Sequence, residues 1–203
     1  MAPHRTRLAA LEAIADAHAS GLASGRQAVA NALDVLIDAA RCSRVSIWLF
    51  EPTRTARDLR CIVVKAAGQP LRDDRTLLAE SQYADYFAAL VERGIFASAD
   101  AMRDPVLLGM RGVYLQANGI GALLDMALNI NGRAYGIVCC EQIPGPRPWT
   151  RGEIGAARAA ITRVGFVLAT RFGDALKSLD SVPIAPLAAT DPDSTIGEMR
   201  RRE

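Results

Sequence analysis

The feature that most constrains this chain of 203 residues is a pair of apolar runs joined by Asn131-Gly132. The first run is IGALLDMALNI and the second is RAYGIVCCE. Asn-Gly is the dipeptide that most readily adopts the positive φ angles of a type I′ turn, which joins two antiparallel strands through a two-residue loop. The sequence therefore predicts a β-hairpin over residues 120–141.

The two-residue loop also predicts the register of this hairpin, because opposed residues then lie at equal distances from the turn. One face is expected to carry bulky pairs, namely Leu128–Tyr135, Met126–Ile137 and Leu124–Cys139. The other face is expected to carry a smaller, slightly polar set, namely Ala127–Gly136, Asp125–Val138 and Leu123–Cys140. We therefore expect helices to pack on the bulky face and a hollow to lie against the other.

The flanking segments predict the remaining elements. RVSIWLFE and LRCIVVK are rich in β-branched and aromatic residues and predict a further hairpin, while IFASA predicts a short strand. Helices are expected in residues 8–15, in 24–37 after a Ser24–Gln27 capping box, and along Tyr83–Leu90 up to Gly94. Two more are expected, from Asp104-Pro105 to about Ala117 and from a Thr150–Glu153 capping box to about Phe172.

Composition and charge exclude several classes of protein. The chain is 50% hydrophobic and 23% charged, which fits one globular domain. Its longest stretch without a charged side chain, 112–124, is shorter than the ~18–20 residues that a membrane helix needs. Glu12 and Asp16 interrupt what would be the apolar part of a signal peptide, so a cytoplasmic location is expected. The arginines are spread along the chain, which does not favour nucleic-acid binding.

The order of elements resembles the GAF family of sensory domains over residues 24–172. The resemblance is carried by RVSIWLFEP, IGALLDMALNINGRAYGIVCCEQ and RPWTRGE, although Ala127 stands where the family usually has proline. It implies an α+β fold with an antiparallel sheet of five or six strands. In that fold the terminal helices cover one face, and a ligand cavity lies under middle helices on the other.

We expect three segments with different roles along the chain. Residues 1–23 would form an N-terminal helix and dimerisation segment, residues 24–172 the sensory domain, and residues 173–203 a flexible tail. Family members bind cyclic nucleotides, tetrapyrroles, haem, amino acids or other metabolites and commonly form homodimers. Because neither flank is long enough for an output domain, we expect a small-molecule sensor that signals in trans to a partner protein, with its cofactor or ligand unidentified.

The candidate ligand-binding residues lie on the smaller face and on the helices expected above it. A lone buried acid such as Asp125 must find a donor, an arginine or a ligand, and we expect it to form the cavity floor with Cys140, with Glu141 solvated at the rim. The expected lid is aromatic and consists of Tyr83, Tyr86, Phe87, Phe96 and Tyr114. Trp48 is a further candidate, although alternation alone does not show whether its strand face meets the cavity or the terminal helices. Aromatic stripes at this spacing are more often plain core than ligand-binding residues.

No catalytic or metal site is predicted. The only histidines, His4 and His18, precede the expected domain, so a Ser/His or Cys/His dyad and histidine-ligated haem are not expected. The four cysteines lack CxxC spacing and are interpreted as buried free thiols. Free methionine sulfoxide reductases of the same family use cysteines in the loops around the pocket, but residues 68–118 contain none. Such a reductase, or an interaction module whose cavity is filled by its own aromatics, is the alternative to a sensor.

Overall fold

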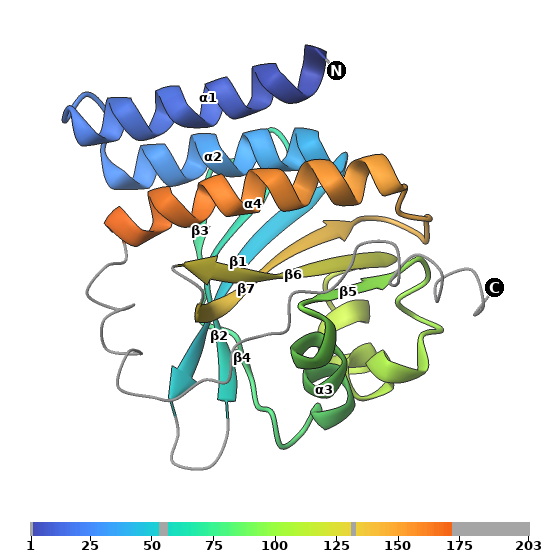
Figure 1. Ribbon diagram of the computed structural model, residues 1–203. Helices are drawn as coiled ribbons and strands as arrows, with labels where there is room; N and C mark the ends of the chain where they lie inside the picture. The colour runs from blue at the N-terminus through green and yellow to red at the C-terminus, as the bar shows by residue number, and fades with distance from the viewer. Residues whose placement is uncertain (1, 53–56, 131–132, 172–203) are drawn as a thin grey trace.

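The computed structural model describes residues 2–52, 57–130 and 133–171, and shows a central sheet between two helical layers (Figure 1). The Asn131-Gly132 turn and the 173–203 segment lie outside the described residues. The strands are β1 (Arg44–Pro52), β2 (Arg57–Ala66), β3 (Arg72–Asp73), β4 (Leu77–Leu78), β5 (Ile95–Ser98), β6 (Ala122–Ile130) and β7 (Arg133–Gln142). They form an antiparallel sheet in the order β3-β2-β1-β7-β6-β5, with β4 pairing to β2. The α+β fold expected from the sequence is confirmed, with two extra strands of two residues each.

Helices α2 (Gly25–Ala40) and α4 (Arg151–Arg171) cover one face of the sheet, and α1 (Ala2–Ala19) packs on the outer side of these two helices (Figure 1). The Ser24 hydroxyl accepts a hydrogen bond from the Gln27 amide at 3.2 Å and caps α2. At the start of α4, the Thr150 amide donates to Glu153 at 2.9 Å and the Glu153 amide donates to Thr150 at 3.2 Å. Both predicted capping boxes therefore mark helix starts, although Gln27 directs its side-chain amide to Asn31.

The opposite face is covered by α3 (Ala84–Arg93), the 3₁₀ helix η1 (Pro105–Met110) and the π-helix η2 (Arg111–Gln116) (Figure 1). Gly94 ends α3 in the left-handed conformation, with φ of 64°. The expected regular helix from Asp104 to Ala117 is wrong in its pitch. Residues 105–110 form a 3₁₀ turn with Leu107 and Met110 buried, and residues 111–116 form a π-helix with Tyr114 and Leu115 buried.

The β6–β7 hairpin contains a bulge that changes its register. Asn129 pairs with Ala134 as expected, but Leu128 pairs with Gly136, so Tyr135 is the extra residue on β7. Every later pair is displaced by one, and Asp125 lies opposite Cys139. The predicted register is therefore wrong beyond the bulge, and the side chains of β7 from Ile137 onward point to the opposite faces from those expected.

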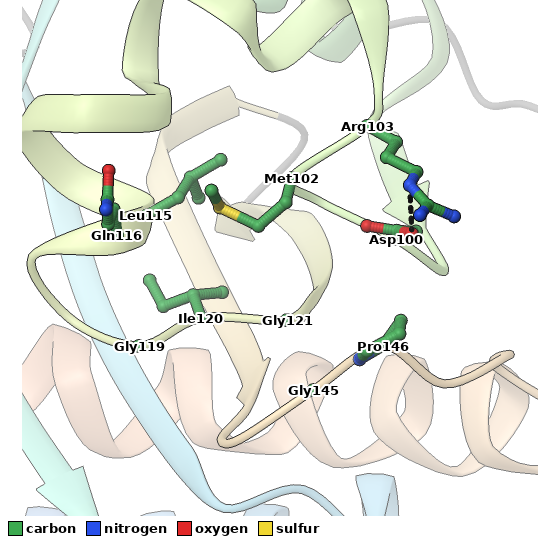
Figure 2. Close-up of a pocket in the computed structure, with 10 residues that line it drawn as sticks. All are labelled: Asp100, Met102, Arg103, Leu115, Gln116, Gly119, Ile120, Gly121, Gly145 and Pro146. Carbon is green, nitrogen blue, oxygen red and sulfur yellow. Dashed lines mark ion pairs between the residues drawn. The ribbon is translucent and has the colours of Figure 1, made fainter.

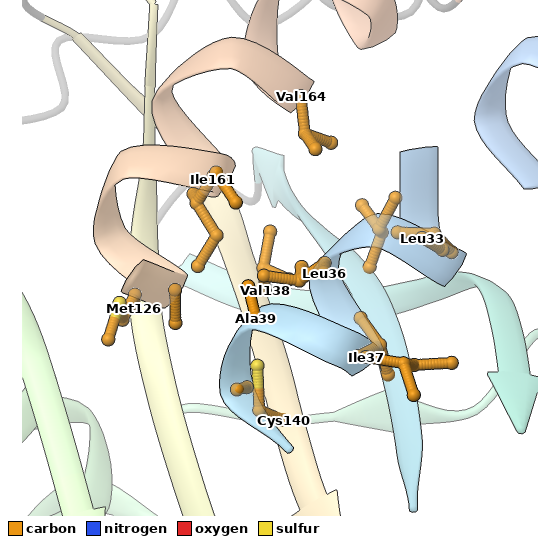
Figure 3. Close-up of a cluster of buried hydrophobic side chains, with 14 of the residues drawn as sticks. Leu33, Leu36, Ile37, Ala39, Met126, Val138, Cys140, Ile161 and Val164 are labelled. Atoms are coloured by element: carbon orange, nitrogen blue, oxygen red, sulfur yellow. The ribbon is translucent and has the colours of Figure 1, made fainter. Parts of the chain in front are cut away.

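Two apolar clusters fill the space on either side of the sheet. Leu124, Met126 and Leu128 of β6 pack with the terminal helices, as expected from the sequence. On β7, the bulge places Val138 and Cys140 in this same cluster (Figure 3). No helix within the described ranges is long and apolar enough to cross a membrane.

Candidate functional site

The sheet face beneath α3, η1 and η2 carries a cluster of buried aromatic side chains from four elements. They are Trp48 and Phe50 of β1, Tyr86 and Phe87 of α3, Phe96 of β5 and Tyr114 of η2. Their rings meet edge to face, with centroid distances of 5.6 Å for Tyr86–Phe96 and 5.7 Å for Trp48–Tyr114. Tyr83 is half-buried at the margin of this cluster. The structure thus gathers the six aromatic residues singled out in the sequence, and it places Trp48 on this face.

Asp125 lies in the floor of the aromatic cluster and is fully buried. The Tyr86 hydroxyl donates a hydrogen bond to Asp125 Oδ2 at 2.6 Å, whereas Oδ1 has no hydrogen-bond partner. Burial raises the pKa of Asp125 from its usual 3.8 to about 7, although the Tyr86 hydroxyl and the Cys139 thiol lower it. Asp125 is therefore a buried acid held by neutral donors.

Glu141 is the second buried acid on this face, and it is compensated. Its Oε2 forms an ion pair with Arg44 Nε, and its Oε1 accepts from the Tyr114 hydroxyl at 2.6 Å. Arg44 Nη1 in turn donates to Asn118 at 3.0 Å. The expectation of a solvated Glu141 is wrong, because the bulge turns its side chain onto the same face as Asp125.

The helices α3 and η2, which cover the aromatic cluster, are each attached to the sheet by one tyrosine–carboxylate hydrogen bond. Tyr86 connects α3 to Asp125 of β6, and Tyr114 connects η2 to Glu141 of β7. Burial raises the pKa of both tyrosine hydroxyls well above their usual value, so both remain protonated donors at neutral pH. The surroundings of the two carboxyl groups differ, because Glu141 forms an ion pair with Arg44 whereas Asp125 accepts from the neutral Tyr86 hydroxyl.

Cys140 does not belong to this face. It lies under α2 and α4 with Val138, Leu36 and Ile161 (Figure 3), and its thiol is hydrogen-bonded to that of Cys42. The bulge is the physical reason, since it exchanges the faces of Cys139 and Cys140. Cys139 is the residue beside Asp125, and sequence alternation alone assigned it to the wrong side.

The cysteines have the character of buried thiols. Burial raises the pKa of Cys61 and of Cys139, while the hydrogen bond with Cys42 and burial raise that of Cys140. A thiol that stays protonated is a poor nucleophile and a poor metal ligand. Within the described residues no group of three or more His, Cys, Asp or Glu side chains is placed to hold a metal ion.

A pocket of about 460 Å³ lies at one end of the sheet (Figure 2), and the ten residues that line it include none of the aromatic side chains named above. It is formed by the end of η2 and by three loops, β5–η1, η2–β6 and β7–α4. A Cβ on Gly121 would lie 2.0 Å from the carbonyl oxygen of Gly145, so this close approach requires glycine. This pocket was not predicted from the sequence. The glycines at 119, 121 and 145 were the available signal, but glycines in loops are too common to identify a site.

Comparisons with known proteins agree with this architecture. The family model described as "GAF domain" matches residues 25–168. The blue-light absorbing form of the Thermosynechococcus elongatus PixJ GAF domain is 16% identical, with a TM-score of 0.56 over 78% of this chain and 95% of that one. The phycocyanobilin-bound GAF domain of a cyanobacterial phytochrome is 13% identical, with a TM-score of 0.61 over 83% and 96%.

The chromophore-binding domain of the R. palustris bacteriophytochrome RpBphP3 is similar in fold as well. It is 15% identical, with a TM-score of 0.55 over 86% of this chain and 62% of that one. No curated protein matches this chain in sequence. At these identities the solved structures establish a shared fold.

Proposed function

The chain belongs to the GAF domain family, and from this premise we propose that it is a sensory domain that binds a small molecule on the sheet face beneath α3, η1 and η2. The observation that carries the proposal is Asp125, a fully buried carboxylate with no hydrogen-bond partner at Oδ1. Unsatisfied buried polar atoms are rare in folded proteins, and each needs a physical explanation. A ligand that donates an N–H or O–H to Oδ1 would provide one.

The surroundings of Asp125 define the kind of ligand. Aromatic side chains with few, well-placed polar groups are typical of small-molecule sites. The proposed lining is the aromatic set together with the acid: Trp48, Tyr83, Tyr86, Phe87, Phe96, Tyr114 and Asp125. Such a site would take a largely apolar or aromatic molecule bearing one hydrogen-bond donor. For the lid to admit it, Tyr86 and α3 would move away from β6.

The route of the signal follows from the two layers. A ligand that favours one arrangement of α3 and η2 shifts the sheet, and the helices α1, α2 and α4 lie on its opposite face (Figure 1). The shift occurs only if the ligand binds the two arrangements with different affinity. In this proposal residues 24–172 sense, residues 1–23 contribute to a homodimer, and the signal passes in trans to a partner protein. Buried free cysteines are typical of a reducing compartment, which supports a cytoplasmic location.

Native mass spectrometry of the full chain tests the proposal. The protein is exposed to a small-molecule extract of cells, desalted and weighed, and we expect a bound molecule that is released on denaturation. Asp125→Asn should lose the adduct. Asp85→Asn is the matched control, because Asp85 is exposed on α3 next to Tyr86 and should not affect it. An unliganded mass before and after exposure contradicts the proposal.

A second candidate function is favoured by one observation, the edge-to-face packing of the aromatic side chains on this face. A ligand-free interaction module would have such a self-filled face, and it would give the unliganded mass. A cysteine-dependent reductase is less consistent with the site, because the raised pKa of Cys61, Cys139 and Cys140 keeps these thiols protonated. A thiol alkylator that reacts rapidly with the native protein would favour the reductase.

A further inference from the structure

The two helices attached to the aromatic face end their hydrogen bonds on carboxyl groups in different surroundings. Tyr114 of η2 donates to Glu141 Oε1 at 2.6 Å, and Arg44 pairs with the other oxygen of that carboxylate. Tyr86 of α3 donates to Asp125 Oδ2 at 2.6 Å, and Asp125 Oδ1 has no hydrogen-bond partner. The Glu141 carboxylate is therefore compensated under a closed η2, whereas a charge on Asp125 under a closed α3 is not.

The groups that face Asp125 supply no positive charge. The helix α3 presents the Tyr86 hydroxyl, and β7 presents the Cys139 thiol and the Glu141 carboxylate. On β5 the residue paired with Asp125 is Phe96, and this strand contains no ionisable side chain. Within the described part of the chain, these neighbours are thus two neutral groups and one like charge. Ionisation of Asp125 leaves a buried charge without a counterion.

A fully buried carboxylate without a counterion is costly, and hydration removes most of this cost. Asp125 is fully buried, so water reaches Oδ1 only when an element that covers it moves. Displacing β5 or β7 would break backbone hydrogen bonds of the sheet. Displacing α3 breaks the Tyr86–Asp125 hydrogen bond and the edge-to-face contact of Tyr86 with Phe96. The movement of α3 is therefore the smaller change.

We propose that loss of the Asp125 proton to solvent releases α3 from the sheet while η2 stays attached through Glu141. Burial raises the pKa of Asp125 from 3.8 to about 7 while α3 is closed, and hydration of the opened face returns it toward 3.8. Opening of α3 therefore becomes more favourable as the pH rises from about 4, and the effect levels off above about 7. This switch requires no ligand, so it goes beyond the proposed sensory function and does not depend on it.

Hydrogen exchange of the full chain at low urea concentrations tests this inference. Each exchange rate is divided by the intrinsic rate at the same pH, which gives the opening constant of that amide. Local opening depends little on urea because it exposes little surface, whereas opening of the whole domain depends strongly on urea. From pH 5 to pH 8, the urea-independent opening constant of α3 should increase by about tenfold or more, and η2 should show no such increase. Exchange of α3 only with the whole domain, or an equal increase in local opening of α3 and η2, overturns the inference.

Variants assign the pH dependence to one carboxyl group. Asp125→Asn cannot ionise, so its α3 should open equally at pH 5 and pH 8. Asp85→Asn is the matched control, because Asp85 is exposed on α3 next to Tyr86 and its loss should leave the wild-type response. Tyr86→Phe removes the donor and keeps the acid, so α3 should open more at pH 5 and still respond to pH, which tests the switch even if Asp125→Asn does not fold. A pH response that persists in Asp125→Asn, or one that is lost in Tyr86→Phe, overturns the assignment.

Discussion

At the residue scale, burial makes the ionised form of Asp125 unfavourable in the folded protein. Its pKa of about 7 lies well above the usual 3.8, so the folded protein holds this proton more tightly than the unfolded chain does. Protonated Asp125 therefore favours the folded state over the unfolded state at low pH. This contribution is lost as the pH rises from about 4 through about 7. The Glu141 charge on the same face adds to the rise, whereas Tyr86 and Cys139 oppose it.

The first prediction follows from this sign. Asp125→Asn should raise the free energy of unfolding at pH 8 by up to about 4 kcal/mol, since one pKa unit corresponds to about 1.36 kcal/mol. At pH 4 the same substitution should have little effect, because Asp125 is then protonated in the folded protein and close to half protonated in the unfolded chain. Urea unfolding at the two pH values measures the difference. With the exposed Asp85→Asn as control, a pH-independent effect of Asp125→Asn would contradict the assigned ionisation.

At the element scale, the arrangement of the site depends on how β7 pairs with its neighbours. The bulge at Tyr135 determines which side chains of β7 face the lid, and Gly136 determines how closely β7 approaches β1. A Cβ on Gly136 would lie 1.9 Å from the Trp48 carbonyl oxygen.

We therefore predict that Gly136→Ala is severely destabilising, by about 3 kcal/mol or more, because the methyl group would force β1 and β7 apart. Gly155→Ala is the matched control. Gly155 lies in α4 with open space around it, and alanine should stabilise that helix by roughly 0.5–1 kcal/mol. Thermal unfolding of both variants gives the comparison. A Gly136→Ala protein as stable as wild type would show that β7 does not approach β1 this closely.

At the scale of the whole molecule, Arg147 joins the β7–α4 loop to the helical layer. Its guanidinium donates to the carbonyls of Ala40 and Arg41 at the end of α2, at 2.8 and 3.0 Å. It also pairs with Glu153 at the start of α4 at 3.1 Å and lies 4.1 Å from the centre of the Trp149 ring. One side chain thus connects the β7–α4 loop, α2 and α4.

Arg147→Gln should lower the free energy of unfolding by about 1–3 kcal/mol, because it removes several charge-assisted hydrogen bonds from a largely buried position. Arg163→Gln, which removes an exposed ion pair, should cost about 0–1 kcal/mol. Chemical denaturation measures both. Hydrogen exchange should also show faster opening at the end of α2 in Arg147→Gln alone, and equal effects of the two variants would refute the connecting role of Arg147.

The sequence by itself determined the α-helices, the five longer strands and the family, because capping boxes, apolar periodicity and turn residues are local signals. Ser24, Thr150 and the aromatic positions on α3 were identified in this way. Only the tertiary structure decided the partners of Asp125 and Glu141, the face of Cys140 and the pocket beside Gly121. The extra residue at Tyr135 exchanges the two faces of β7 from Ile137 onward. Side chains alternate between faces on both sides of such a bulge, so the sequence pattern does not reveal where the exchange occurs. Loops distant in sequence make the pocket, and their proximity is set by packing that no short stretch of the chain encodes.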